Sequence, residues 1–211
     1  MSVKPAPRIK ICGLTRPQDA EQCAAAGADA IGLVFYPPSP RHVPIEAARA
    51  VIAALPPFVT VVALFVDPSV EEVEAVLQAL PVDVLQFHGE EPPEFCRQFA
   101  RPYLKAVRVR PDMDLTAYAR RYADARGLLA DAFVPGQAGG TGAVFDWTLL
   151  PPDLPLPLVL SGGLTPDNVT DAVQRVRPAA VDVSSGVEAA KGIKDAALIA
   201  AFISGVRHAD L

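Results

Sequence analysis

The sequence predicts an α/β fold, a (β/α)8 barrel that forms one domain over residues 1–211. Short apolar runs typical of β-strands recur eight times, and helical patterns lie between most of them. Most of these runs are continuously apolar, as expected for strands that are covered on both faces. No Pro/Gly/Ser-rich linker or change of composition divides the chain. Eight strand–helix units in one domain of this length fit a barrel at the small end of its size range.

The expected strands are bounded by turn residues and follow one another at regular intervals. They are residues 8–12, 30–35, 60–66, 82–87, 103–109, 127–131, 156–160 and 179–184.

Helix signals separate these strands. Thr15 and Gln18 have the spacing of a capping box and predict a helix that ends at Gly27. Ser69 and Glu72 have the same spacing ahead of an amphipathic run. The other expected helices are residues 44–55, a helix after Thr165, and residues 194–205, with weaker patterns at 92–99, 115–122 and 145–150.

A doubly wound open sheet is the alternative architecture. It normally has fewer strands and places its phosphate loop after the first strand. In this chain that loop is Cys12-Gly13-Leu14-Thr15, which lacks the GxGxxG pattern. The barrel therefore remains the preferred prediction.

Composition excludes several classes of protein. The chain is 51% hydrophobic and 20% charged, so it can bury a sizeable core and is not disordered. Its net charge of −5 argues against a nucleic-acid partner. No apolar run approaches the ~20 residues that span a bilayer, and the start of the chain has no apolar signal core. We expect a cytoplasmic protein with no membrane partner.

The cysteines are three in number and scattered along the chain: Cys12, Cys23 and Cys96. This pattern fits free thiols in a reducing compartment better than a disulfide framework. Cys23 and Cys96 fall within helical patterns and are expected to be packing residues. Three histidines and no paired CxxC pattern give no reason to expect a metal site.

Polar residues gather at the expected strand ends. In a (β/α)8 barrel the loops after all eight strands meet at one rim, which is the usual place of chemistry. This distribution indicates an enzyme. The polar residues at or just after the expected strand ends are Cys12, Arg41, Asp67, His88, Asp131, Ser161, Ser184 and Ser185.

Two glycine-containing loops predict a phosphate site. Ser161-Gly162-Gly163-Leu164 follows the seventh strand, and Ser184-Ser185-Gly186 follows the eighth. In barrels these loops commonly hold a phosphate with backbone N–H groups and a short helix N-terminus. The segment Gly139-Gly140-Thr141-Gly142, after the sixth strand, could close over the same ligand. The alternative is that the glycines only permit tight turns. We expect a phosphorylated small molecule as the partner.

Closure of the barrel makes the sixth, seventh, eighth and first strands neighbours. A ligand at the phosphate loops would then lie between Asp131 and Cys12. A carboxyl group and a thiol on opposite sides of one ligand suit general acid–base chemistry, provided that the thiol can ionise. The alternative for Cys12 is a small buried apolar residue.

Two further side chains are candidates for substrate contacts. Arg41 follows a proline-rich loop, and a guanidinium held there suits a carboxylate, although a solvated surface arginine is equally consistent. His88 ends the fourth strand and is either a structural histidine or a substrate contact. Glu90 and Glu91 are expected at a solvated helix start.

The chain resembles the phosphoribosylanthranilate isomerases of tryptophan biosynthesis. The similarity covers nearly the whole chain and follows the family order. It is carried by Lys10-Ile11-Cys12-Gly13-Leu14-Thr15, Phe35 through Ser39-Pro40-Arg41, Gln86-Phe87-His88-Gly89, Gly139-Gly140-Thr141-Gly142 through Phe145-Asp146-Trp147, Ser161-Gly162-Gly163-Leu164, and Asp182-Val183-Ser184-Ser185-Gly186-Val187-Glu188 through Gly192-Ile193-Lys194-Asp195.

The resemblance implies an Amadori rearrangement of N-(5-phosphoribosyl)anthranilate to 1-(2-carboxyphenylamino)-1-deoxyribulose 5-phosphate. It implies Asp131 as the general acid at the ribose ring oxygen and Cys12 as the general base at C2 of the sugar. Arg41 would hold the anthranilate carboxylate. The resemblance implies no cofactor and no metal, because the iminium intermediate is itself the electron sink. His88, Gly142, Gly162, Gly163, Ser184, Ser185 and Gly186 complete the expected substrate site.

Two other functions remain open at this point. A histidine-pathway sugar isomerase performs the same rearrangement but resembles a two-aspartate arrangement, whereas the first strand here ends in Cys12. A non-catalytic phosphate-binding barrel would have no reason to hold both Cys12 and Asp131 at the rim. The sequence leaves the oligomeric state, monomer or homodimer, undecided.

Overall fold

The computed structural model describes residues 6–132 and 145–209. Its elements in chain order are β1 Arg8–Cys12, α1 Pro17–Ala26, β2 Ala30–Val34, α2 Ile45–Ala53, β3 Thr60–Phe65, α3 Val70–Ala79, β4 Val84–Phe87, α4 Pro93–Arg97, β5 Tyr103–Val109, α5 Leu115–Arg121, β6 Gly127–Ala132, the 3-10 helix η1 Trp147–Leu149, β7 Leu158–Leu160, α6 Val169–Val176, β8 Ala180–Val183, the 3-10 helix η2 Ser185–Val187, β9 Glu188–Ala190, β10 Ile193–Lys194 and α7 Ala196–Arg207.

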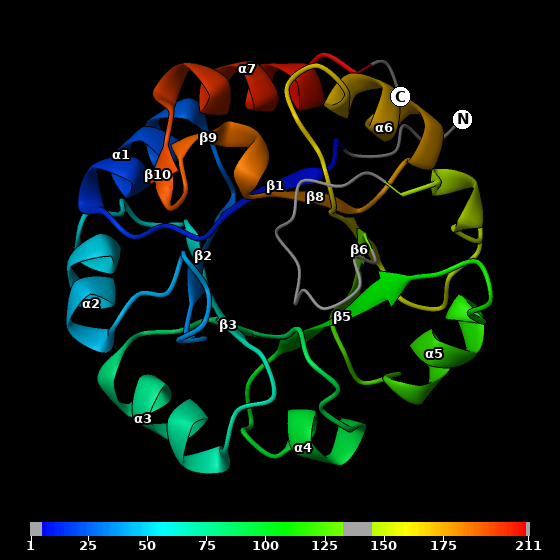
Figure 1. Cartoon of the computed structure of the whole chain (residues 1–211), viewed down its shortest axis with the longest axis horizontal. Coiled ribbons are helices and arrows are strands. Elements are labelled where there is room, and N and C mark those ends of the chain that lie inside the picture. Colours follow the sequence, from blue (N-terminus) through cyan, green and yellow to red (C-terminus); the bar gives the residue numbers. More distant parts are fainter. Residues whose placement is uncertain (1–5, 133–144, 210–211) are drawn as a thin grey trace.

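Strands β1 to β8 form a closed parallel barrel in sequence order, surrounded by the helices (Figure 1). The barrel closes by pairing of β1 with β8, with Lys10 opposite Asp182. This architecture confirms the predicted fold. Each expected strand is present, and the predicted bounds of β1 and β5 coincide with the observed ones.

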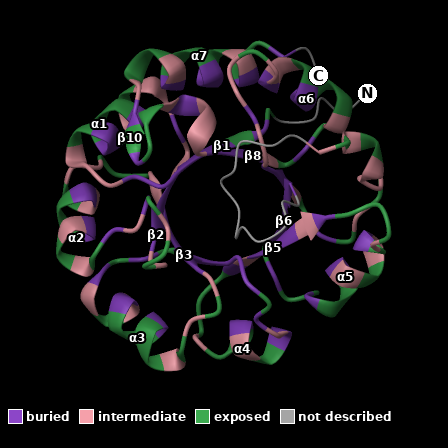
Figure 2. Ribbon diagram, viewed as in Figure 1, coloured by how far each residue is buried: buried purple, intermediate pink, exposed green. Residues whose placement is uncertain are grey.

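Alternation along each strand divides the side chains between two environments. Ile9 and Ile11 belong to the main core between the strands and the helices, so Lys10 and Cys12 face the barrel interior. Smaller apolar clusters lie inside the barrel, one of them formed by Cys12, Val34 and Leu64. Figure 2 shows the buried strands ringed by helices whose outer surfaces are exposed.

The two predicted capping boxes have different outcomes. The box of Ser69 and Glu72 is present and opens α3. The box of Thr15 and Gln18 is wrong: α1 begins after Arg16 without a side-chain cap. The Thr15 hydroxyl instead donates to the carbonyl oxygen of Gly192 at 2.6 Å, which ties the loop after β1 to the β9–β10 connection. The predicted end of α1 at Gly27 is confirmed.

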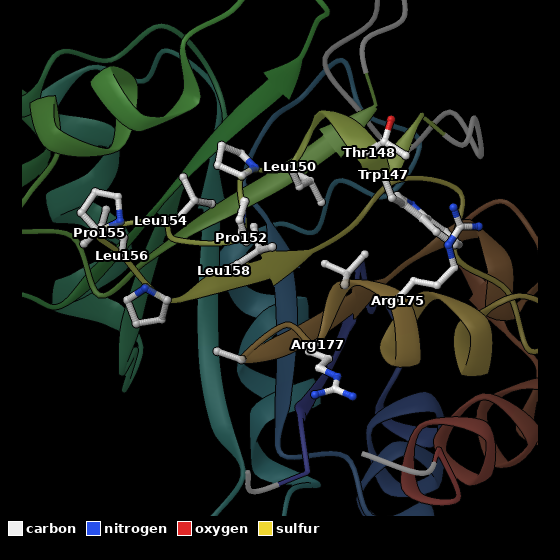
Figure 3. A pocket seen from close by; sticks show the side chains of 14 residues that line it. Trp147, Thr148, Leu150, Pro152, Leu154, Pro155, Leu156, Leu158, Arg175 and Arg177 are labelled. Carbon is white, nitrogen blue, oxygen red and sulfur yellow. The ribbon is translucent and has the colours of Figure 1, made fainter.

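The expected helix at residues 145–150 is a single 3-10 turn, η1. A groove of about 700 Å³ lies between η1, the proline-rich segment that follows it, and α6 (Figure 3). Trp147 packs on the core at one end of this groove, with the guanidinium of Arg175 at 5.5 Å from its ring centroid. A short turn therefore covers this part of the barrel wall in place of a full helix.

The antiparallel pair β9–β10, which the sequence did not predict, follows η2 after the last barrel strand. It carries Glu188 and Lys194 at opposed positions, and both lie near the rim residues described below. In the part of the chain that the structure describes, no helix is long and apolar enough to cross a membrane.

Candidate active site

Cys12 lies at the carboxyl end of β1 with its side chain on the inner face of the barrel. It is only 5% exposed. Its carbonyl oxygen accepts a hydrogen bond of 3.0 Å from the Ser184 hydroxyl, which links the ends of β1 and β8. Burial raises the pKa of the Cys12 thiol, and the positive charge of Lys10 opposes that rise. The thiol therefore depends on nearby cations if it is to act as a base.

Asp131 lies in β6, also at the barrel interior, and is 4% exposed. Its Oδ1 accepts from the backbone N–H of Ala132 at 2.8 Å, and its Oδ2 lies 3.1 Å from His88 Nε2. His88 Nδ1 is in turn 3.1 Å from the side-chain nitrogen of Gln86. His88 is thus held between Gln86 and the expected acid, Asp131.

The loops after β7 and β8 have the backbone geometry that their glycines allow. Gly162 and Gly163 have φ values of +82° and +64°, a backbone conformation that residues other than glycine rarely adopt. A side chain at Gly186 would overlap the carbonyl oxygen of Leu164, so the two loops lie in direct contact. Successive backbone N–H groups in such loops can bind an anion.

The serines of the last loop differ in their roles. The Ser184 hydroxyl donates to Cys12, and its oxygen accepts from Lys194 Nζ at 3.3 Å. Ser184 therefore joins the first and last strands of the barrel. Ser185 is half-buried and begins η2. Gly142 and its neighbours Gly139, Gly140 and Thr141 lie outside the described residues.

Arg41 is buried and forms a two-pronged ion pair with Glu188. The distances are 2.7 Å from Nε to Oε1 and 2.8 Å from the terminal nitrogen Nη2 to Oε2. Lys194 Nζ also donates to Glu188, at 2.9 Å. The side chain of Arg41 packs against Gly13: a Cβ atom added to Gly13 would lie 2.6 Å from Arg41 Cδ. The carboxylate that holds Arg41 in this structure is therefore one of the protein's own.

The expectation that Glu91 is a solvated helix residue is wrong. Glu91 is buried and accepts from Lys105 Nζ at 2.7 Å and from the backbone N–H groups of Asp67 and Gly89. It fixes the loops after β3 and β4 against β5. Glu90, by contrast, is exposed as expected.

Sequence reasoning assigned no role to five polar residues near the site. Three of them interrupt otherwise apolar barrel strands, where alternation with apolar neighbours was a signal that could have identified them, and two belong to the β9–β10 pair. They are Lys10, Gln86, Asp182, Glu188 and Lys194.

Cys23 and Cys96 are buried packing residues, as predicted, and all three cysteines are free. Among the described residues, no group of three or more His, Cys, Asp or Glu side chains could hold a metal ion.

The closed parallel barrel places a thiol, a carboxyl group and two glycine-containing loops at the carboxyl ends of adjacent strands, which is where (β/α)8-barrel enzymes hold their catalytic groups. Comparison with known proteins identifies the family to which this barrel belongs. The family model described as N-(5'-phosphoribosyl)anthranilate (PRA) isomerase matches residues 9–205, and the chain belongs to this family. Its members are aldose–ketose isomerases of tryptophan biosynthesis.

Individual relatives agree over nearly their full lengths. The chain is 64% identical to the N-(5'-phosphoribosyl)anthranilate isomerase of Dechloromonas aromatica over 203 residues, which are 96% of this chain and 97% of that protein. The crystal structure of phosphoribosyl anthranilate isomerase from Thermotoga maritima has a TM-score of 0.87 and 43% identity, and covers 95% of this chain and 98% of its own. A crystal structure of a phosphoribosyl anthranilate isomerase in complex with reduced 1-(o-carboxyphenylamino)-1-deoxyribulose 5-phosphate has a TM-score of 0.84 and 41% identity, with the same coverage.

Proposed function

We propose that Cys12 and Asp131 are the general base and the general acid of the isomerisation of N-(5'-phosphoribosyl)anthranilate. The observation that carries this proposal is the order of the strands. Closure of the barrel makes β6, β7, β8 and β1 consecutive, with Asp131 on the first and Cys12 on the last. Both side chains face the interior, one on each side of the loops after β7 and β8.

The proposed reaction begins at Asp131. Its carboxylic acid gives a proton to the ribose ring oxygen while the C1–O bond breaks, and the anthranilate nitrogen supplies the electron pair that forms the iminium. The thiolate of Cys12 then removes the proton from C2, and the C–H electrons neutralise the iminium to give an enolamine. Tautomerisation of the enolamine yields the ketone. No redox partner is needed, because C2 of the sugar is oxidised and C1 is reduced within the same molecule.

The substrate's two anionic ends have separate proposed sites. The phosphate binds the backbone of Gly162, Gly163 and Gly186 with Ser185, because these loops lie in contact and carry the left-handed glycines. Arg41 binds the anthranilate carboxylate, sharing its guanidinium with Glu188. The complex of a relative with a phosphorylated product analogue supports a phosphorylated substrate.

The roles of the two catalytic groups are tested by Cys12→Ala and Asp131→Asn. Each should lower kcat by roughly 10²-fold to 10⁴-fold with the circular dichroism spectrum retained, since each removes one proton-transfer group. The measurement follows the fluorescence of phosphoribosylanthranilate as it is consumed.

Matched controls are available for both substitutions. Cys23→Ala removes a buried thiol from the outer side of the barrel and should leave kcat unchanged. Asp67→Asn replaces a carboxylate at another strand end and can still accept from the backbone of Glu90. A folded Cys12→Ala or Asp131→Asn protein with near-normal kcat would remove that residue from its assigned role.

We further propose that residues 1–211 form one domain and act in the cytoplasm. The domain proposal rests on the closure of β1 against β8, which joins the two ends of the chain in one barrel. The free state of Cys12, Cys23 and Cys96 supports a reducing compartment.

A further inference from the structure

Lys10 carries a charge inside the barrel, directly below the rim. It precedes Cys12 by two positions in β1, so the two side chains lie on the same inner face. Lys10 is 5% exposed, and a buried charge is costly unless it is paired. Its ammonium donates to Asp182 Oδ1 at 2.7 Å, across the β1–β8 pair in which Lys10 and Asp182 are register partners.

Gly32 leaves room for both this ammonium and the thiol. It is the β2 register partner of Cys12, and its missing side chain leaves space above its Cα atom. A Cβ atom at Gly32 would lie 2.6 Å from Cys12 Sγ and 3.0 Å from Lys10 Nζ. The sulfur and the ammonium thus lie on either side of the space that a larger residue would fill, close enough for the charge of one to act on the other.

Four charged groups interact electrostatically with the sulfur. Lys10 is the cation with the largest effect, Lys194 acts from β10, and Arg41 acts from the loop after β2. Asp182, on β8, is the opposing anion. Burial raises the pKa of the Cys12 thiol, and among the charges Lys10 opposes this most strongly.

Lys10 itself is protonated at neutral pH. Burial alone would lower its pKa, but Asp182 and Cys12 together hold the pKa above the ordinary value for lysine. The ammonium is therefore a positive charge near the sulfur at neutral pH.

We propose that Lys10 is a positioning residue for the reaction: held by Asp182 and accommodated by Gly32, its ammonium stabilises the Cys12 thiolate. The inference rests on the proposed role of Cys12 as the base. A purely structural pair between β1 and β8 would need neither a position near the sulfur nor a glycine at position 32. The proposal differs from a structural role because it requires the two members of the pair to move the thiol titration in opposite directions.

The test measures the pH dependence of alkylation of Cys12 by iodoacetamide, followed by mass spectrometry of the peptide that contains it. Lys10→Met should shift the midpoint to higher pH, and a shift of one unit lowers the rate at neutral pH about tenfold. Lys10→Arg should retain a midpoint close to wild type, because the cation remains. Asp182→Asn keeps an acceptor for Lys10 but removes the anion, and should shift the midpoint to lower pH.

Lys105→Met is the matched control. Lys105 is also buried and paired with a carboxylate, Glu91, but it lies on the outer side of the barrel strands. This variant should leave the Cys12 midpoint unchanged. If Lys10→Met proves unfolded by circular dichroism, Lys10→Gln and the Asp182→Asn shift decide the question.

Equal shifts of the midpoint in Lys10→Met and Lys105→Met would overturn the proposal, as would folded Lys10 variants with the wild-type midpoint. An upward shift in Asp182→Asn would overturn it too. The acidic limb of the kcat profile should move with the alkylation midpoint in each variant. If Cys12→Ala were active while the alkylation shifts occurred as expected, the role of Cys12 as base would fail and the effect of Lys10 on the thiol would stand.

Discussion

At the scale of single residues, the site is organised by buried charges whose partners are distant in sequence. Arg41 and Glu188 are 147 positions apart, and Lys10 and Asp182 are 172 apart. The position of Cys12 and Asp131 at strand ends could be predicted, because strand ends are local features. The partner of Arg41 could not, because only closure of the barrel brings Glu188 to it.

The shared use of Arg41 gives a prediction for substrate binding. Arg41→Ala removes the hydrogen bonds that we propose to the anthranilate carboxylate, so KM should rise by roughly 10-fold to 100-fold with a smaller change in kcat. Steady-state kinetics of the folded variant check this. Arg49→Ala, at an exposed and loosely paired arginine of α2, should leave KM unchanged. An unchanged KM in Arg41→Ala would take the residue out of the carboxylate site.

At the scale of elements, the same sequence spacing leads to different helix starts. Ser69 caps α3, where its hydroxyl oxygen accepts from the Glu72 N–H at 3.2 Å. Thr15 has a tertiary acceptor, the Gly192 carbonyl, and Pro17 already occupies the first turn of α1. A local motif therefore predicts a cap only where no distant group takes the side chain. The helix expected at residues 145–150 also differs from the prediction: its weak helical pattern supports only the single 3-10 turn η1 against the barrel wall.

The capping box of α3 predicts a measurable loss of stability. Ser69→Ala removes the acceptor for the Glu72 N–H and should lower the free energy of unfolding by about 1 kcal/mol. Urea denaturation with a constant m-value measures this. Ser69→Asn retains a capping oxygen and should remain near wild type. Equal losses in both variants would show that the cap hydrogen bond is not the source.

At the scale of the whole molecule, the periodic alternation of strands and helices was enough to predict the closed barrel and the order of groups around its rim. The apolar runs ending at Cys12 and Asp131 placed the proposed base and acid on flanking strands before any contact was known. The β9–β10 pair escaped prediction because its residues carry weak strand patterns and are held by ion pairs. Glu188 and Lys194 acquire their roles only when this pair folds back on the loop after β2.

Glu188 links the loop after β2 to the β9–β10 pair at the barrel rim, and its ionisation should therefore affect the stability of the whole fold. Its carboxylate accepts from Arg41 after β2, from Lys194 on β10 and from the Gly192 N–H. Burial alone would raise the pKa of Glu188, but the hydrogen bonds and charges of Arg41 and Lys194 outweigh it and hold the pKa below the ordinary value. A lowered folded-state pKa means that the ionised group stabilises the native state above the unfolded-state pKa, ~4.3, and that this contribution is lost as the pH falls through the folded-state value.

Glu188→Gln should therefore be less stable than wild type at neutral pH, and the difference in the free energy of unfolding should shrink as the pH falls below ~4.3. Urea unfolding of both proteins over a pH series measures this difference. Glu74→Gln, at an exposed glutamate of α3, serves as the control and should show little difference at any pH. A gap between wild type and Glu188→Gln that stayed constant into the acid range would mean that packing around the side chain, and not its charge, joins the loop after β2 to the β9–β10 pair.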